Sequence, residues 1–288
     1  MEIELAVGAA AGLGEGPVWD PSRAELLWVD IASNEVHRLD PSRGVDEVLV
    51  LTHAASAVVP RAGGGAVAAV ADGFAFLDLD TGVLTSVAQV PPGTAGKRMN
   101  DGACDSLGRF WAGSIADEGS ASGILCVFDP TGDVVPLLYG VSVSNGLGWS
   151  PDGRLFYYID SATRGIDVFA CDLATCSIRR RRRLVTCPPS WGIPDGLAID
   201  ALGNLWVAFF GGWALRHISP LGAVLQTVEM PAQYVTSCAF GGDDYSDLFV
   251  TTASQRLSPE EKRAQPLAGS VFRLRVQTPG LPTMLFGG

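Results

Sequence analysis

Four side chains that can bind a metal ion recur at one position of a repeated sequence pattern. Each is the fifth residue before a turn signal, and the four are Glu15, Asn100, Asn145 and Asp195. For Asn145 the turn signal is Ser150-Pro151-Asp152-Gly153, and the residues before it favour a strand. A second turn at Asn145 would leave that strand no room. We therefore interpret Asn145 as the start of a strand rather than as part of an Asn-Gly turn.

This set of side chains predicts a site for one divalent metal ion. Two carboxylates and two amide oxygens that meet in a buried place need a cation, because unpaired buried charge is costly. Oxygen donors favour Ca, Mg or Mn over Zn and Fe, and the sequence does not resolve which of the five binds. The three histidines, His37, His53 and His217, lie elsewhere in the repeat. Asp101, beside Asn100, either binds the metal through a water molecule or caps the strand.

A second repeat marks the strands that must position these residues. A compact apolar run follows each turn, and the equivalent residues of these runs are Trp28, Ala68, Trp111, Phe156, Trp206 and Phe249. Their spacing of about 40 to 50 residues is the period of a four-stranded propeller blade. Six such units fill the chain, which predicts an all-β fold, a six-bladed β-propeller with a metal ion in the central channel. We expect residues 1–288 to form a single domain of this kind.

The propeller interpretation brings the four metal-binding side chains together. The first strand of each blade lines the central channel, so residues at one phase of successive repeats converge on its axis. The four are expected to meet near one mouth of the channel. In the two remaining units, Ala55-Ser56 and Thr236-Ser237 stand near the same phase and bind metals poorly. We expect the ring to stay open there to water or substrate.

The composition argues against nucleic-acid and membrane partners. The formal net charge of −11 and the pI near 4.7 leave no broad basic surface. The one basic run, Arg179–Arg183, is interpreted as an outer edge strand whose charges oppose pairing with another sheet. Glu2 and Glu4 stand where a signal peptide would be basic, and no apolar run is long enough to cross a membrane. We expect a cytoplasmic monomer or weak homo-oligomer with six reduced cysteines.

Six further strings stand in order along the chain. They are Leu13-Gly14-Glu15-Gly16-Pro17-Val18-Trp19, Arg98-Met99-Asn100-Asp101-Gly102, Ser144-Asn145-Gly146-Leu147, Phe156-Tyr157-Tyr158-Ile159-Asp160-Ser161, Ile193-Pro194-Asp195-Gly196 and Pro266-Leu267-Ala268-Gly269. Together they resemble the gluconolactonase family of sugar lactone hydrolases, which is also called the regucalcin or senescence marker protein family. The resemblance extends from about residue 10 to residue 276.

The resemblance implies a six-bladed propeller that hydrolyses aldonolactones of the gluconolactone or pentonolactone type. It implies one catalytic divalent metal ion, held by Glu15, Asn145 and Asp195. It implies that the substrate contacts are Arg98, Asn100 and Glu118, and that Asp195 is also the general base. The expected partner is thus a small-molecule sugar lactone.

Several points stay open on the sequence alone. Arg98 shares a strand face with Asn100 or else forms a surface ion pair. Glu118 lies in a small-residue loop that is either a mobile lid or a solvated loop. The base is either Asp195 or a metal-bound hydroxide acting alone. Met99 and Trp191-Gly192 depart from the family pattern, which leaves the identity of the lactone open.

Two other functions are the alternatives. One is an organophosphate or aryl-ester hydrolase of the same propeller type, which would use similar oxygen ligands and a different pocket. The other is a non-catalytic calcium-binding propeller, in which the metal would only support the structure.

Overall fold

The chain forms an all-β structure, as the repeat of short apolar runs predicts. The computed structural model describes residues 2–92, Thr94 and 96–288. Four of its sheets have four antiparallel strands each and are formed in chain order. Their strands are β2 (Gly14–Asp20), β3 (Glu25–Asp30), β4 (Glu35–Asp40) and β5 (Val45–Val50); β6 (Ala57–Pro60), β7 (Ala66–Val70), β8 (Gly73–Leu77) and β9 (Leu84–Gln89); β10 (Arg98–Cys104), β11 (Phe110–Ile115), β12 (Gly123–Phe128) and β13 (Val134–Val141); β14 (Ser144–Trp149), β15 (Leu155–Asp160), β16 (Gly165–Asp172) and β17 (Ser177–Thr186).

A fifth sheet contains the remaining eight strands. These are β18 (Ile193–Ile199), β19 (Leu205–Phe210), β20 (Ala214–Ile218), β21 (Val224–Glu229), β22 (Tyr234–Gly241), β23 (Asp247–Ala253), β24 (Val271–Arg275) and β1 (Ile3–Val7). The strands β18–β21 and the strands β22, β23, β24 and β1 form two four-stranded groups, which are joined through the pairing of Phe210 with Tyr234.

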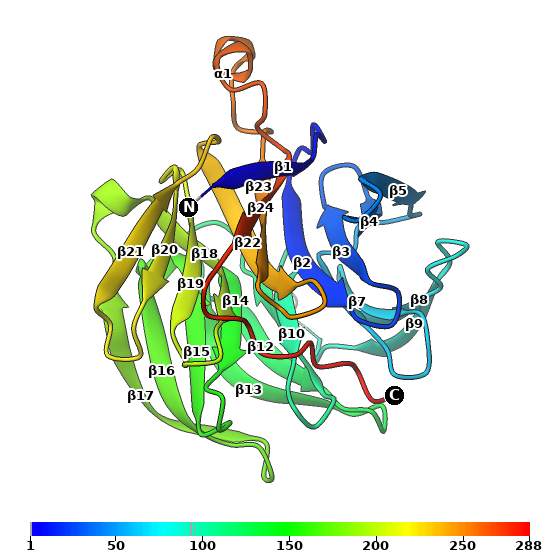
Figure 1. The fold of residues 1–288 in the computed structure, drawn as a ribbon. Helices are drawn as coiled ribbons and strands as arrows, with labels where there is room; N and C mark the ends of the chain where they lie inside the picture. Colours follow the sequence, from blue (N-terminus) through cyan, green and yellow to red (C-terminus); the bar gives the residue numbers. More distant parts are fainter. Residues whose placement is uncertain (1, 93, 95) are drawn as a thin grey trace.

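The sheets are arranged around a common centre. Figure 1 shows β2, β10, β14, β18 and β22 nearest this centre, with β5, β17 and β21 at the rim. Each inner strand is the first of its group along the chain, except that β1 from the N-terminus is the outer strand of the last group, so the chain enters every group at the centre. Residues at one phase of the repeat are thereby brought to the same inner surface.

Apolar residues of the second strands hold neighbouring sheets together. The six equivalent residues of the repeat lie in β3, β7, β11, β15, β19 and β23, and none exposes more than 3% of its surface. One apolar cluster, for example, joins Leu27 and Val29 of β3 to Val58 of β6 and Ala68 of β7. Because both faces of these strands are covered, their sequences are continuous apolar runs rather than alternating ones.

The two ends of the chain close the arrangement in ways that the repeat does not predict. β1 pairs with β24 in antiparallel register, so the N-terminal strand completes the last four-stranded group. Residues 277–288, here called the C-terminal strap, cross the molecule and appear as the red segment of Figure 1. Near its end, the Phe286 side chain is 1% exposed and stacks on Phe128 with 5.1 Å between ring centroids.

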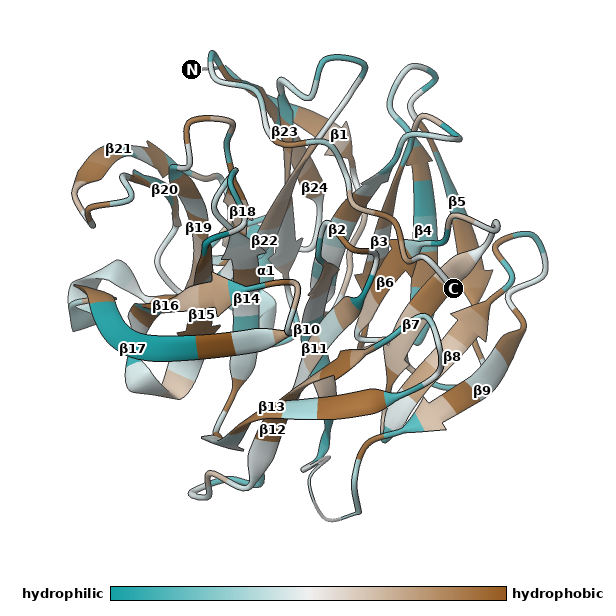
Figure 2. Ribbon diagram, turned by 90° about the horizontal axis from the view of Figure 1, so that it is seen from below, coloured by the Kyte–Doolittle hydropathy of each residue, from teal (hydrophilic) through white to brown (hydrophobic). Residues whose placement is uncertain are grey.

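The structure confirms the interpretation of the basic run. Arg179–Arg183 lie in β17, which is the outermost strand of its sheet and forms the hydrophilic band in Figure 2. The five side chains are exposed, and both Arg181 and Arg183 pair with the buried Asp167. The charges therefore cover an edge that could otherwise pair with another sheet.

The smaller expectations also agree with the structure. The one α-helix in the described residues, α1 (Pro259–Ala264), begins with a capping box between Ser258 and Glu261. Two 3₁₀ turns are also present, η1 (Ser161–Thr163) between β15 and β16 and η2 (Pro189–Trp191) before the inner strand β18. All six cysteines are free. No helix in the described residues is long and apolar enough to span a membrane.

Candidate metal centre

The four predicted metal-binding side chains lie on inner strands and at irregularities of those strands. Glu15 is in β2, Asn100 in β10, Asn145 in β14 and Asp195 in β18, and we call these four residues the central ring. In each strand the pairing register with the next strand shifts at or directly after the ring residue. A bulge of this kind turns a side chain away from the regular alternation of the strand. It aims each ring side chain at the centre.

Steric crowding explains why a glycine follows both Asn145 and Asp195. A Cβ atom on Gly146 would stand 2.7 Å from the carbonyl oxygen of Asp195, and one on Gly196 would stand 2.1 Å from the Ser237 hydroxyl. Neighbouring inner strands approach too closely here for any side chain. The Asn-Gly and Asp-Gly pairs are therefore not turns, and they mark the points where inner strands meet.

A chain of hydrogen bonds runs through Asn100 and Asn145, the two amide members of the ring. Arg98 Nη1 donates to Asn100 Oδ1 at 2.6 Å, and Asn100 Nδ2 donates to Asn145 Oδ1 at 2.9 Å. Asn145 Nδ2 donates to Ser161 Oγ at 2.8 Å, and this hydroxyl donates to the carbonyl oxygen of Pro194 at 2.6 Å. Both amide groups are fixed in orientation by these bonds. Asn100 turns its oxygen to Arg98 and its nitrogen to Asn145, whereas Asn145 turns its oxygen to its ring neighbour Asn100.

The interactions of Arg98 decide between its two predicted environments. It shares a strand face with Asn100 and bonds to it, and its side chain is half-buried. Among the described residues it forms no ion pair within 4.0 Å. Burial lowers the pKa of Arg98, while the carboxylates of Glu15 and Asp195 oppose that change. Arg98 is therefore an interior cation beside the ring rather than part of a surface ion pair.

Burial disfavours the ionised form of both ring carboxyls, Glu15 and Asp195. Burial raises the pKa of Glu15 to about 8, and the neighbouring Asp101 carboxylate adds to this effect. Burial, followed by repulsion from Glu15 and Asp101, raises the pKa of Asp195 well above its usual range. Asp195 Oδ1 is buried and has no hydrogen-bond partner among the described residues. Buried oxygens of this kind require a proton or a cation.

The donor set fits a hard divalent cation. Glu15 and Asp195 supply carboxylate oxygens, Asn145 supplies an amide oxygen, and Asp101 lies close enough to repel both carboxylates. No group of three or more His, Cys, Asp or Glu side chains in the described part of the chain is arranged to hold a metal. A site here consequently depends on the Asn145 amide as a ligand. Mixed carboxylate and amide oxygen ligands suit calcium or magnesium better than zinc.

Two further carboxylates position the strands that enter the ring. Asp30, at the end of β3, accepts hydrogen bonds from Gly12 N and Leu13 N at 2.9 Å each. Asp160, at the end of β15, accepts from Ser142 N at 3.0 Å and Val143 N at 2.9 Å. Sequence reasoning missed this pair. Asp30 stands two residues after Trp28 but Asp160 stands four residues after Phe156, so the sequence repeat did not place them at one phase, whereas the strand pairing does, with Asp30 opposite Gly14 and Asp160 opposite Ser144.

The two poorly coordinating units leave the ring incomplete, as predicted from their residue types. The Ser56 hydroxyl donates to Ala69 O at 3.2 Å, and the Thr236 hydroxyl donates to Gly14 O at 2.6 Å. Both hydroxyls therefore bond to backbone. The part of the ring beside Ser56 and Thr236 contributes no charged donor.

The inner strands become more exposed toward the ends at which the chain enters them. Ring residues are 6 to 8% exposed, whereas the residues two positions earlier are half-buried or exposed. These earlier residues, here called the mouth residues, are Leu13, Ala54, Arg98, Val143, Ile193 and Tyr234. A ligand would reach the ring past this mouth.

Glu118 is not part of the buried ring. It lies in the exposed loop between β11 and β12, and no hydrogen bond or ion pair of its side chain occurs in the described part of the molecule. The loop from residue 117 to residue 122 is exposed throughout. Contact between Glu118 and a substrate therefore stays a prediction.

We expect Ser161→Ala to weaken metal binding while the fold is kept. The substitution removes the acceptor that holds Asn145 Nδ2, so the amide loses its fixed orientation. Loss of such a supporting bond weakens metal binding by about 10- to 100-fold. Calorimetric titration of chelator-treated protein with calcium measures the change. Thr163→Val is the matched control, because it removes a hydroxyl of the same 3₁₀ turn that bonds only to Asp160 O. Equal affinities of the two variants would contradict the role of Ser161.

The chain matches one described protein family and several of its members. A family model described as SMP-30/Gluconolactonase/LRE-like region matches residues 13–254. The chain is 38% identical over 296 residues to regucalcin from Gallus gallus, covering 100% of this chain and 99% of that protein. It is 34% identical over 290 residues to a protein of Bacillus subtilis (strain 168) whose name assigns it as a sugar lactone lactonase, YvrE, with the same coverage.

A solved structure agrees over nearly the whole length. The calcium-binding protein regucalcin from Agrobacterium tumefaciens superposes with a TM-score of 0.92 at 28% identity, covering 98% of this chain and 96% of that one. The resemblance carried by the ordered sequence motifs is thereby confirmed. The chain belongs to the SMP-30/gluconolactonase/LRE-like family.

Proposed function

We propose that the protein is a divalent-metal-dependent lactonase that hydrolyses sugar aldonolactones of the gluconolactone or pentonolactone type. Membership in a family that contains lactonases supports the reaction class. The observation that carries the proposal is the ring of Glu15, Asn145 and Asp195, in which a buried carboxylate oxygen has no partner among the described residues. Such an arrangement is costly unless a cation binds.

We infer a single six-bladed propeller over residues 1–288. The two four-stranded groups of the eight-stranded sheet count as two blades in this interpretation, because only Phe210 and Tyr234 pair between them. The inner strand of each blade then lines one channel. This geometry supports one metal site on the axis, with ligands from three blades.

The proposed metal ligands are Glu15, Asn145 and Asp195, and the proposed metal is calcium. Oxygen donors favour it, and the solved regucalcin structure reported above is described as calcium-binding. A divalent ion at this place would polarise the lactone carbonyl and make water a stronger acid. The two carboxylates would offset its charge, and Asn145 would orient its oxygen through the bond to Ser161.

The proposed substrate contacts are Arg98, Asn100 and Glu118. Arg98 is a mouth residue and bonds to Asn100, so both can meet a lactone that enters toward the ring. The guanidinium would stabilise negative charge that develops on the carbonyl oxygen and would donate to ring hydroxyls. Glu118 would reach the substrate only if its exposed loop closes toward the mouth.

Asp195 is the proposed general base. Its Oδ1 atom is unpartnered in the described structure and can accept a proton from an attacking water. Burial and the neighbouring carboxylates raise the pKa of Asp195 in the metal-free protein, whereas a bound cation would lower it again. The carboxylate is thus a weak base that acts through its position.

The composition of the mouth favours a second candidate, an aryl-ester hydrolase. Four of the six mouth residues are aliphatic, and Tyr234 packs on Phe210 with 4.4 Å between ring centroids. Such walls suit an apolar leaving group as well as the carbon face of a sugar. The two candidates share the ring and differ in how much they need Arg98.

A lactone panel tests the proposal. Proton release is measured after glucono-, xylono- or arabinonolactone is added to chelator-treated protein and to the same protein with calcium restored, with spontaneous hydrolysis subtracted. We expect metal-dependent acceleration with at least one lactone. If none is hydrolysed faster while calcium still binds, the non-catalytic calcium-binding propeller is the better interpretation. If only aryl esters such as phenyl acetate are hydrolysed, the aryl-ester hydrolase is the better interpretation.

We expect Arg98→Ala to lower kcat/KM for the preferred lactone by about 100-fold, because the guanidinium that donates to the hydroxyls of the sugar ring is lost. Hydrolysis of phenyl acetate should fall much less. Arg154→Ala is the matched control, since the Arg154 side chain is 85% exposed. Equal losses for the lactone and the ester would assign Arg98 to the fold rather than to sugar recognition.

A further inference from the structure

The centre of the molecule contains a second space, on the far side of the ring from the mouth. A cavity of about 240 Å³ is lined by the inner strands after their ring residues, including Trp19, Cys104, Trp149 and Ile199. None of the four ring residues and none of the mouth residues lines it. The cavity, here called the far chamber, is therefore separated from the mouth by the ring.

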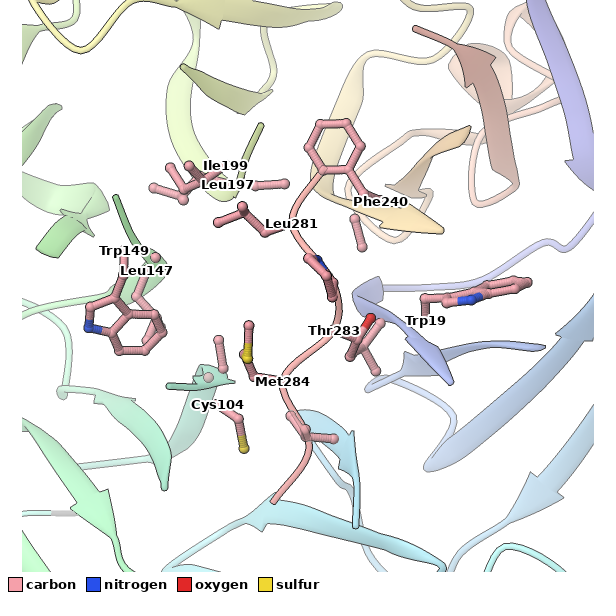
Figure 3. A pocket seen from close by; sticks show the side chains of 18 of the residues that line it. Trp19, Cys104, Leu147, Trp149, Leu197, Ile199, Phe240, Leu281, Thr283 and Met284 are labelled. Carbon is pink, nitrogen blue, oxygen red and sulfur yellow. The ribbon is translucent and has the colours of Figure 1, made fainter. Parts of the chain in front are cut away.

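The C-terminal strap forms the outer wall of the far chamber. Figure 3 shows Leu281, Thr283 and Met284 crossing between Trp149 on one side and Trp19 on the other. Most of the other lining side chains are aliphatic or aromatic, such as Leu147, Leu197 and Phe240. The chamber is a mostly apolar space of definite size rather than a polar water channel. An apolar cavity of about 150 Å³ is large enough for a benzene molecule.

The inner end of the chamber carries acceptors and no cation. Asp101 and Ser237 line it next to the ring, and Asp101 accepts a hydrogen bond from Gly102 N at 2.7 Å. No lysine or arginine lines the chamber among the described residues. The carboxylates disfavour an anion at this place. The proposed metal ion would disfavour an ammonium group, a point that rests on the proposed function.

The strap is held at its ends and free along its middle. Pro279 O accepts from Ala201 N at 2.8 Å, and Phe286 N donates to Pro60 O at 2.9 Å. Between these anchors, none of the hydrogen bonds of the described residues uses the backbone of residues 281–285. This middle part can move outward without breaking a backbone hydrogen bond, which gives a small molecule a way in.

We propose that the far chamber is a binding site for a small uncharged molecule with an apolar body and one hydroxyl group. The body would lie between the aromatic walls, and the hydroxyl would donate to Asp101. The occupant would touch Asp101, which adjoins the ring residue Asn100, and Ser237, which adjoins Thr236 at the equivalent place in β22, so it would lie directly behind the proposed metal site. Its site is separate from the lactone mouth.

Three ligands with one shared body test the proposal. They are 3-phenyl-1-propanol, 3-phenylpropanoate and 3-phenylpropylammonium, titrated calorimetrically into the full-length protein with calcium bound. We expect one molecule of the alcohol to bind with a Kd of about 10⁻⁴ to 10⁻³ M. The two charged ligands should bind at least about tenfold more weakly. Binding of the acid as tight as that of the alcohol would overturn the proposed ligand class.

Two strap variants locate the site. Thr283→Trp places an indole in the chamber and should weaken binding of the alcohol by about tenfold or more. Gln277→Trp adds the same group at an exposed position of the same strap and should leave the Kd unchanged. Equal affinities of these variants, or no binding by the parent protein, would overturn the proposal. If Thr283→Trp does not fold, Met284→Ala replaces it, and this variant must bind the longer 5-phenyl-1-pentanol more tightly than the parent does.

The outcome is independent of lactone turnover. The alcohol titration is repeated in chelator, where the ammonium ligand should bind better than it does with calcium present. Binding of the alcohol without any lactone hydrolysis would support the proposed ligand site and contradict the proposed lactonase function. Lactone hydrolysis without alcohol binding would support the lactonase function and contradict the ligand site in the far chamber.

Discussion

Replacing Asp195 by asparagine is expected to abolish lactone hydrolysis and, at the same time, to stabilise the metal-free protein. The side chain keeps its size, so the inner strands stay in place. Removal of the proposed base and metal ligand should lower kcat/KM by about 10³-fold. In the metal-free parent protein, Asp195 is either ionised without a partner or protonated against its preference in water, and asparagine avoids both costs. A gain of about 1 to 3 kcal/mol in the free energy of unfolding at pH 8 follows.

A buried carboxylate elsewhere is the matched control for Asp195→Asn. Asp105 is fully buried and accepts hydrogen bonds from Arg109 Nε and Trp111 Nε1, both at 2.7 Å. Asp105→Asn should therefore destabilise the protein by about 3 kcal/mol and leave kcat/KM of the folded fraction unchanged. Activity is measured at saturating calcium, and stability by urea unfolding in chelator. If Asp195→Asn also destabilises the metal-free protein, the carboxylate has a stabilising partner and the empty ring is not strained.

The central ring could be predicted from the sequence because the repeat itself encodes it. Each ring residue stands at a fixed distance before a turn, and blades repeat their geometry. The convergence of Glu15 with Asp195 therefore follows from phase alone, and the charged environment that the structure gives them is the expected result. The all-β class was predictable for the same reason, since the apolar runs of the second strands recur at one spacing.

Features that do not repeat could not be predicted in this way. β1 pairs with β24, which comes from the opposite end of the chain. The C-terminal strap lies outside the sequence repeat, so no repeat unit predicts its course. The supports of the ring were missed for another reason. Asp160 and Ser161 act through bonds to Val143 N and Asn145 Nδ2, and such bonds depend on where a strand ends in space. Glu118 lies in a loop between strands, so its position in the sequence repeat does not predict where its side chain points.

The metal-free protein is expected to lose stability as the pH rises from 5 to 8. The pKa of Glu15 is raised from 4.5 to about 8, and that of Asp101 from 3.8 to about 6. Between the unfolded and folded values, the folded protein holds protons that the unfolded chain releases. Each such group lowers the free energy of unfolding by about 1.4 kcal/mol per pH unit, and the fall ends once the pH passes the folded value. Urea unfolding in chelator at pH 5 and pH 8 should therefore differ by several kcal/mol.

Saturating calcium should remove this loss, because a cation beside Glu15 and Asp195 favours their ionised forms and lowers both pKa values. The carboxyls with lowered pKa, such as Asp30 and Asp200, lose their contribution only when the pH falls below about 4, so they do not affect the comparison. Glu15→Gln tests the effect, since it removes a carboxyl whose pKa is raised from 4.5 to about 8. That variant should show a smaller difference between pH 5 and pH 8 in chelator and a weaker response to calcium. A metal-free parent protein as stable at pH 8 as at pH 5 would mean that water, and not a cation, solvates these carboxylates.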